Sequence, residues 1–388
     1  MSLPVEMAMG PVWTTAQKGC HKELRRPMLE GTSLDKPLTR EEVSAVIEGR
    51  GCARRVPLII HQWLYPDVFK DPATRARVRE LMEGYPSDAA FIRWQPIQLW
   101  DAPPDDPDYR WMHGDKLAQD SGAAIDASGP LSDWAMLDEV LEHFPKASYP
   151  GLLASIPPED GRYRVGHWWY NYFERHWQLR GMTHALMDYY TYPEEVHRLF
   201  SALTEFYIGM MKRMKEAGAD AIYTTDDIGT QTGPFFSPGI FDEFYAPYYK
   251  RQIEAAHEMG MHFWLHSCGE ISLHLPKLID FGLDVIHPIQ KFAMNAEETA
   301  ARYGGKVCFW AGFDVQQAIP YGTVEDVRAE VRRLFDIFGR SDGRLMLTMG
   351  NGATPDWPVP SLEALFDEAL KYGTATVQKF KTTPAKTG

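Results

Sequence analysis

The feature that most constrains this fold is a regular alternation of short apolar runs and amphipathic segments in the second half of the chain. Each apolar run has the length of one buried strand, and the segments between them repeat apolar residues at helical spacing. Apolar strands separated by helices predict a parallel sheet covered by helices. The apolar runs span residues 221–227, 262–268, 285–290, 307–313 and 345–351.

Two hydroxyl residues mark where helices begin. Thr39 opens the sequence T-R-E-E, and Glu42 three residues later completes a capping pattern. Thr323 occupies the same position before the amphipathic segment 323–338. A further helical stretch runs from residue 183 to Gly218, and apolar runs at 56–64 and 89–97 predict two more strands.

The spacing of strands favours one closed barrel. No Gly-rich phosphate fingerprint follows any strand, which disfavours a nucleotide-binding Rossmann sheet. We predict an α/β fold, a single (β/α)8 TIM barrel over residues 39–375, with an irregular N-terminal arm at 1–38 and a tail at 376–388. The Pro- and aromatic-rich stretch at 98–170 is expected to be an insertion that lines or covers a site.

The composition excludes several classes of function. Lys and Arg total 40 against 53 Asp and Glu, so the net charge of −13 argues against nucleic-acid binding. No apolar stretch approaches the roughly 20 residues of a membrane helix, and the first residues do not resemble a secretory signal. Four cysteines in 388 residues do not form a disulfide framework, so we expect a reducing, cytoplasmic setting.

Polar side chains follow each predicted strand of the second half. In a (β/α)8 barrel the carboxyl ends of the strands face the active site, so these residues are site candidates. The predicted catalytic carboxylates are Asp226, Asp227 and Asp314, and the alternative for Asp314 is a cap of the turn after its strand. The predicted substrate-binding residues are Gln231, His287, Gln290, Asn351 and, from the aromatic segment 167–177, Trp168. The alternative for His287 is a hydrogen-bonded structural residue, and the alternative place of Trp168 is the core.

The sharpest local signal is His266-Ser267-Cys268-Gly269. Residues two apart on a strand point to the same side, so the imidazole and the thiol share one face. Both are good zinc ligands, although a buried Cys beside a hydrogen-bonded His is the alternative interpretation. Asp226 and Asp227 are adjacent, so one faces the site while its neighbour caps the next segment.

These segments resemble the uroporphyrinogen decarboxylase superfamily, which also contains cobamide-dependent thiol methyltransferases. The resemblance implies a (β/α)8 barrel acting on a small molecule. It is carried by LTREEVSAVIEGRGCARRVPL (38–58), by AGFDVQQAIPYGTVEDVRAEVRR (311–333), by PVPSLEALFDEALKYG (358–373), and by the long blocks at 224–260 and 266–290.

Two motifs separate the branches of this superfamily. The decarboxylases carry an Arg-rich N-terminal motif, RQAGRxxPE, of which this chain keeps only Arg25 and Arg26. They also carry a late Gly-His-Gly turn, and this chain has Asn351 at the position of that His. The methyltransferases bind zinc through His-x-Cys and a late Cys. His266 and Cys268 match the first part, whereas Asn351 replaces the late Cys. The resemblance leaves His287, Glu270, Asp226 and Asp227 as candidates for a third ligand.

The leading hypothesis is therefore methyl transfer between a small thiol, methoxy or methylamine substrate and a corrinoid, with zinc at His266 and Cys268. No cobalamin-binding D-x-H-x-x-G motif occurs in the chain, so a separate carrier protein is expected to supply the corrinoid. One alternative is metal-independent decarboxylation of a carboxylated aromatic or tetrapyrrole, with Asp226 or Asp227 stabilising a cationic intermediate. The second alternative is an inactive barrel that only binds a tetrapyrrole or a partner protein.

Overall fold

The computed structural model describes residues 36–94, 129, 131–142 and 146–382. Most of the predicted arm, including Arg25 and Arg26, and residues 98–128 of the predicted insertion lie outside this range. The described residues form two compact units. The first contains the described residues of the ranges 91–158 and 164–283, and the second contains residues 36–90, Glu159–Tyr163 and residues 284–382.

The first unit is built on strands in the order β2-β1-β3-β4-β5. β3, β4 and β5 are parallel, whereas β2 pairs with β1 in the antiparallel sense. The strands are β1 (Ala89–Trp94), β2 (Leu153–Ser155), β3 (Tyr163–Trp168), β4 (Ala221–Thr225) and β5 (His262–His266). β2 and β3 fall inside the predicted insertion, so part of that stretch belongs to the sheet.

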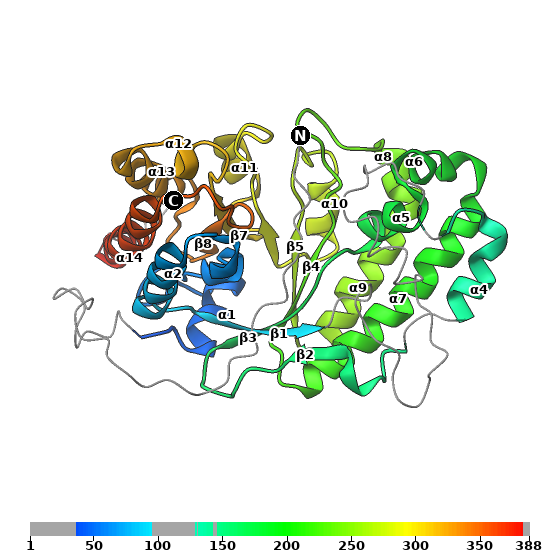
Figure 1. Ribbon diagram of the computed structural model, residues 1–388, viewed down its shortest axis with the longest axis horizontal. Helices are drawn as coiled ribbons and strands as arrows, with labels where there is room; N and C mark the ends of the chain where they lie inside the picture. The colour runs from blue at the N-terminus through cyan, green and yellow to red at the C-terminus, as the bar shows by residue number, and fades with distance from the viewer. Residues whose placement is uncertain (1–35, 95–128, 130, 143–145, 383–388) are drawn as a thin grey trace. The chain divides into compact units, whose positions relative to one another are not determined.

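Helices cover this sheet. α9 packs on β5, α7 packs on α9, and α4 packs on α7 (Figure 1). The helices are α4 (Leu137–Glu142), α5 (Tyr172–Arg180), α6 (Met182–Thr191), α7 (Pro193–Glu216), α8 (Pro238–Ile240), α9 (Ala246–Glu258) and α10 (Leu275–Asp280), with the 3₁₀ turns η5 (Trp134–Met136) and η6 (Pro150–Leu152) and the π-helical segment η7 (Phe241–Tyr245). Apolar residues of α7 from Val196 to Met214 are buried, as its amphipathic pattern requires.

The second unit carries the parallel strands β6, β7 and β8. Helix α13 packs against β7 and against α14. Most apolar residues of α13 are buried. The elements of this unit are β6 (Val285–His287), β7 (Cys308–Phe313), β8 (Leu345–Met349), α1 (Arg40–Glu48), α2 (Pro72–Gly84), α11 (Ala296–Tyr303), α12 (Ala318–Tyr321), α13 (Val324–Phe338) and α14 (Val359–Thr382), with the turns η1 (His61–Trp63) and η2 (Pro66–Val68).

The alternation of parallel strands and helices places the chain in the α/β class, consistent with the predicted (β/α)8 barrel. Both predicted caps are present as capping boxes, Thr39 with Glu42 and Thr323 with Asp326. The run at 56–64 contributes only a parallel bridge from Leu58 to Leu347 before the turn at His61–Trp63. The residues from 376 onward, predicted as a tail, continue α14 as far as Thr382.

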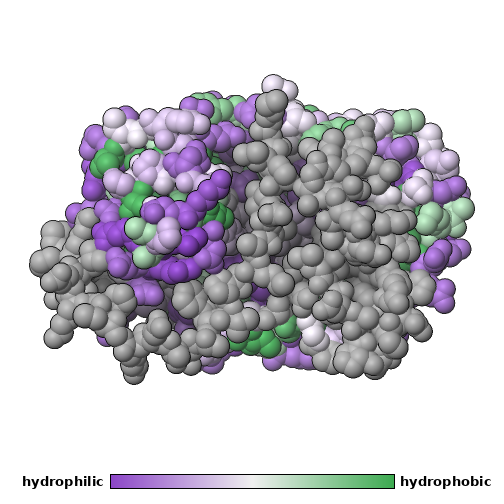
Figure 2. Space-filling view, viewed as in Figure 1, coloured by the Kyte–Doolittle hydropathy of each residue, from purple (hydrophilic) through white to green (hydrophobic). Residues whose placement is uncertain are grey.

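Hydrophilic residues predominate on the visible face of the second unit, with apolar residues scattered among them (Figure 2). No helix among the described residues is both long enough and apolar enough to cross a membrane.

Candidate functional site

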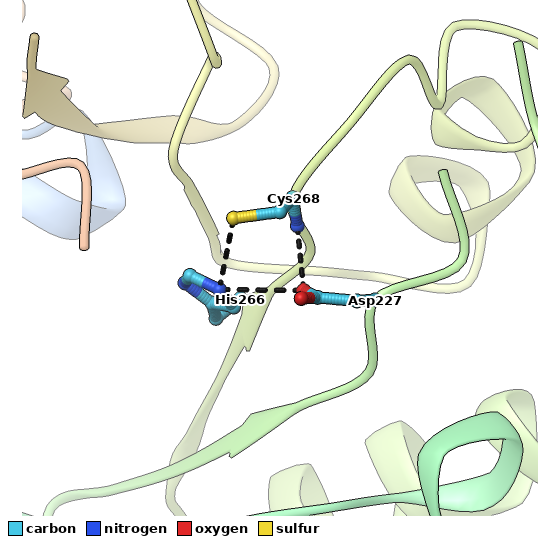
Figure 3. Close-up of side chains that lie close together, drawn as sticks. All are labelled: Asp227, His266 and Cys268. Carbon is cyan, nitrogen blue, oxygen red and sulfur yellow. Dashed lines mark hydrogen bonds and ion pairs between the residues drawn. The ribbon is translucent and has the colours of Figure 1, made fainter. Parts of the chain in front are cut away.

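Asp227, His266 and Cys268 converge in the first unit, where β4 and β5 end side by side (Figure 3). The Cys268 Sγ lies 3.4 Å from the His266 Nε2, and the Asp227 Oδ1 lies 3.3 Å from the same nitrogen. All three ligand atoms fall within 4.8 Å of one another. The structure therefore brings together the predicted His-x-Cys pair and one of the four carboxylate or imidazole candidates for a third ligand.

These separations suit a tetrahedral divalent ion. With zinc–ligand bonds of about 2.0 to 2.3 Å, tetrahedral angles place a nitrogen and a sulfur ligand about 3.6 Å apart and a nitrogen and an oxygen ligand about 3.4 Å apart. For the two pairs that include the His266 Nε2, the observed 3.4 Å and 3.3 Å require only small movements, and the Cys268 Sγ and the Asp227 oxygen lie within 4.8 Å of each other. One imidazole, one thiol and one carboxylate are also ligand types that zinc accepts, so the residues present fit this metal.

Backbone contacts between the segments after β4 and β5 hold the three side chains together. The Asp226 amide donates to the His266 carbonyl at 2.9 Å, and the Glu270 amide donates to the Thr230 carbonyl at 2.8 Å. Gly269 has φ of +90°, and a Cβ there would lie 2.3 Å from the carbonyl carbon of Gly229. Two glycines thus allow the segments to approach closely enough for a shared site.

Asp227 is oriented by the end of β5, through His266, and by Cys268 just after that strand. Its Oδ1 accepts a 2.7 Å hydrogen bond from the Cys268 amide, and its side chain remains 39% exposed. Burial raises the pKa of Asp227, but the hydrogen bond from His266, the charge of that imidazole and the Cys268 amide outweigh it and leave the pKa below its usual range. The carboxylate is therefore charged and accessible, as a metal ligand must be.

Asp226 faces the opposite way and caps α5. Its carboxylate accepts from the amides of Tyr172, Phe173 and Glu174 at 3.1, 3.2 and 2.9 Å. The Tyr249 hydroxyl donates a further 2.6 Å bond. Burial raises the pKa of Asp226 to about 6, against the lowering effect of these hydrogen bonds. Of the two predicted carboxylates, one joins the ligand group and the other satisfies the amides at the start of a helix.

Two residues that the sequence prediction missed, Glu174 and Arg175, lie beside this cap. Glu174 is buried and accepts a 2.7 Å hydrogen bond from the Thr225 hydroxyl. Burial, followed by the charges of Asp227 and Asp226, raises the pKa of Glu174 well above its ordinary value. Arg175 follows Glu174 directly, and Tyr170, from the predicted aromatic segment, lies four positions before Glu174. The available signal was the presence of two charged residues, Glu174 and Arg175, inside an otherwise aromatic segment.

The other predicted residues of the first unit lie apart from the ligand group. Trp168 is fully buried and stacks on Tyr207 of α7 with ring centroids 5.2 Å apart, which is a core position rather than a pocket wall. Gln231 is exposed in the turn after β4. Glu270 accepts from the Ser272 amide at 2.9 Å and is not in the ligand group.

Four predicted residues belong to the second unit. His287 is buried, its Nε2 lies 2.8 Å from the Met349 carbonyl, and its ring stacks on Trp63. Asp314 accepts from two amides of the following turn and lies 3.4 Å from the Lys291 Nζ. Gln290 is half-buried, and the exposed Asn351 accepts from the Gly352 amide.

Comparison with known proteins identifies the class. The sequence model of the uroporphyrinogen decarboxylase (URO-D) family matches residues 178–372, which is half of the chain. The chain belongs to the uroporphyrinogen decarboxylase family. This match begins within α5 and includes every residue of the ligand group.

Relatives with two different names are similar to this chain. A uroporphyrinogen decarboxylase of Xanthomonas oryzae is 28% identical over 42% of this chain and 46% of its own length. The methylcobamide:CoM methyltransferase MtbA of Methanosarcina mazei is 25% identical over 47% of this chain and 51% of its own. The match therefore spans about half the length of these relatives.

The fold also has a solved counterpart. The structure of a methyltransferase from Methanosarcina mazei superimposes with a TM-score of 0.54 at 16% identity, over 86% of this chain and 99% of that chain. At this level of identity the likeness establishes the fold, and function has to be argued from the site.

Proposed function

We propose that this protein is a methyltransferase that moves a methyl group between a small substrate and a corrinoid, using a zinc ion held by Asp227, His266 and Cys268. The observation that carries the proposal is the convergence of these three ligand atoms within 4.8 Å. Similarity to a methylcobamide:CoM methyltransferase supports the reaction class. The corrinoid would be supplied by a separate carrier protein.

Each residue has a separate task in this proposal. His266 is only 4% exposed and supplies the buried nitrogen ligand. Asp227 and Cys268 approach it from the two segments that Gly229 and Gly269 bring together. The Cys268 amide orients the Asp227 carboxylate, which completes the set in place of the late Cys of the methyltransferase branch. A zinc ion bound there would act as a Lewis acid that favours the deprotonated form of a thiol or polarises a methoxy or amine group.

Metal content tests this proposal directly. Purified protein is expected to contain about one zinc per chain by elemental analysis, and Cys268→Ser is expected to lose it. Cys308→Ser is the matched control, because that thiol is fully buried in β7 of the second unit. Zinc-loaded protein should then accelerate the loss of methylcobalamin absorbance in the presence of 2-mercaptoethanol. Wild-type protein that takes up no zinc overturns the proposal.

Decarboxylation is the second candidate, because several curated relatives carry that name. It requires carbon dioxide release without metal and a loss of that activity in one of the two adjacent Asp variants. Asp227→Asn is the sharper test, since Asp226 already accepts four hydrogen bonds. Carbon dioxide release from a carboxylated pyrrole in the presence of a chelator would favour this candidate over methyl transfer.

A further inference from the structure

Arg175 of α5 carries a fully buried guanidinium, and the charge of the adjacent Glu174 interacts with it only from beyond ion-pair distance. Among the described residues, no Asp or Glu oxygen lies within 4.0 Å of its nitrogens. Its acceptors are neutral: the Gln178 Oε1 at 3.0 Å and the Trp169 carbonyl at 3.5 Å. Its Nε has no hydrogen-bond partner in the described part of the chain. A permanent charge removed from water is normally paired, so this arrangement requires a reason.

Two other buried arginines of the same chain are each paired with a carboxylate. Arg55 is also fully buried, and it forms a two-point contact with Asp88 at 2.6 and 2.8 Å. Arg180, five residues beyond Arg175 at the end of α5, contacts both oxygens of Asp188 at 2.8 and 3.0 Å. The fork of a guanidinium matches the two oxygens of a carboxylate, and only Arg175 of these three lacks one.

A strained neighbour holds the Arg175 side chain in place. Tyr170 has φ of +67°, a left-handed conformation that aromatic residues rarely adopt. Its amide donates to the Thr225 hydroxyl and its carbonyl accepts from the Tyr207 hydroxyl, both at 2.9 Å. These two bonds fix the ring 5.5 Å from the Arg175 guanidinium, in cation–π geometry. Strain of this kind persists where the surroundings impose it and is common at ligand sites.

This arrangement adjoins the proposed metal ligands. The Asn171 amide donates to the Thr225 carbonyl at 2.7 Å, so the segment after β3 is fastened to the end of β4. Asp226 and Asp227 follow Thr225 directly in the chain. Glu174 accepts from the same Thr225 hydroxyl and lies beyond ion-pair distance of Arg175. Within the described part of the chain, a cation that no carboxylate contacts at ion-pair distance thus lies on the helix that Asp226 caps, and Asp226 is the sequence neighbour of the proposed ligand Asp227.

We propose that Arg175 binds a carboxylate group of the substrate and that Tyr170 holds the guanidinium ready for it. Gln178 is half-buried, so its amide oxygen is the acceptor that an incoming carboxylate replaces. The exchange turns a neutral hydrogen bond into a charge-assisted, two-point contact. The inference rests on the proposed function, because it names the substrate group bound beside the metal ligands.

The test measures carboxylate binding with and without zinc. Benzoate and succinate are the probes, benzyl alcohol is the neutral control, and binding is followed by calorimetry and by the shift in Tm. Wild-type protein is expected to bind at least one of the two carboxylates and not the alcohol. Arg175→Gln is expected to weaken that binding about tenfold or more while zinc content stays unchanged. Arg198→Gln, an exposed arginine of α7, is the matched control and should bind as wild type does.

Gln178→Glu provides an independent measurement, since it places a carboxylate where the ligand group would bind. This variant is expected to raise Tm without ligand and to abolish the response to benzoate and succinate. Wild-type protein that binds neither carboxylate, or equal binding by wild type and Arg175→Gln, overturns the inference even when zinc binds normally. Protein that binds no zinc but shows the Arg175-dependent response overturns the proposed function alone.

Discussion

The backbone amide of Cys268 donates a 2.7 Å hydrogen bond to the Asp227 carboxylate, so a residue of one strand end orients a ligand from the neighbouring strand end. The same oxygen lies 3.3 Å from the His266 Nε2. The ligand group is therefore preorganised by the backbone, and its geometry does not depend on the flexible side chains alone.

Asp227→Asn is the first prediction. The amide keeps the shape of the carboxylate but removes its charge, so we expect zinc affinity to fall by about tenfold or more with the fold unchanged. Competition against a chromogenic chelator measures the affinity. Asp242→Asn, which removes an exposed carboxylate paired with Lys277, is the control and should bind zinc normally. Equal affinity for Asp227→Asn and wild type would remove Asp227 from the ligand set.

Asp226→Asn is expected to affect stability rather than metal binding. Its amide group would turn donor hydrogens toward three backbone amides and a tyrosine hydroxyl that now share a carboxylate. We expect the free energy of unfolding to fall by about 2 to 4 kcal/mol, as for the loss of a buried helix cap. Urea denaturation measures this change. A variant as stable as wild type but unable to bind zinc would reverse the roles assigned to the two neighbours.

Gly269→Ala tests the close approach that forms the site. Its Cβ would lie 2.3 Å from the Gly229 carbonyl carbon, so the two segments must separate and zinc affinity should fall by about tenfold or more. Gly161→Ala is the control, because Gly161 has a similar φ of +84° but nothing within 4 Å of its Cβ. That variant should lose some stability and keep its zinc. Comparable zinc affinities in the two variants would contradict the steric explanation.

Acid sensitivity is expected from His61 in the second unit. Burial lowers the pKa of His61, although its ring nitrogen lies 2.9 Å from the Met82 carbonyl. As the pH falls below about 6.5, His61 becomes protonated in the unfolded chain but stays neutral in the folded protein. Stability is therefore lost from that pH downward. Tm should decrease between pH 7.5 and 5.5, and His61→Gln should reduce this slope. His184→Gln, an exposed histidine of α6, should retain the wild-type slope; equal slopes for all three proteins would contradict the prediction.

The sequence predicted those features that depend on local patterns. The caps at Thr39 and Thr323 follow from residues three positions apart, and the shared face of His266 and Cys268 follows from the geometry of a strand. Five strands of the second half were located for the same reason, since each is a short apolar run between helices.

Features that depend on distant contacts were not predictable. Asp226 and Asp227 are chemically identical in sequence, and only the hydrogen bonds to α5 and to Cys268 distinguish the cap from the ligand. The run at 56–64 has the composition of a strand, but beyond Leu58 the chain turns into η1, which periodicity cannot show. The burial of Arg175 depends on how α5 packs, which its aromatic sequence context does not specify.

The opposite orientations of Asp226 and Asp227 have a mechanical consequence. One carboxylate of this dipeptide reaches toward the ion site and the other holds the first turn of α5, so neither can shift without displacing the backbone that carries both. Occupancy of the ion site should therefore be communicated to the amides of Tyr172, Phe173 and Glu174, whose hydrogen exchange would slow on loading. The helix that carries Arg175 would then be most ordered when the neighbouring site is filled.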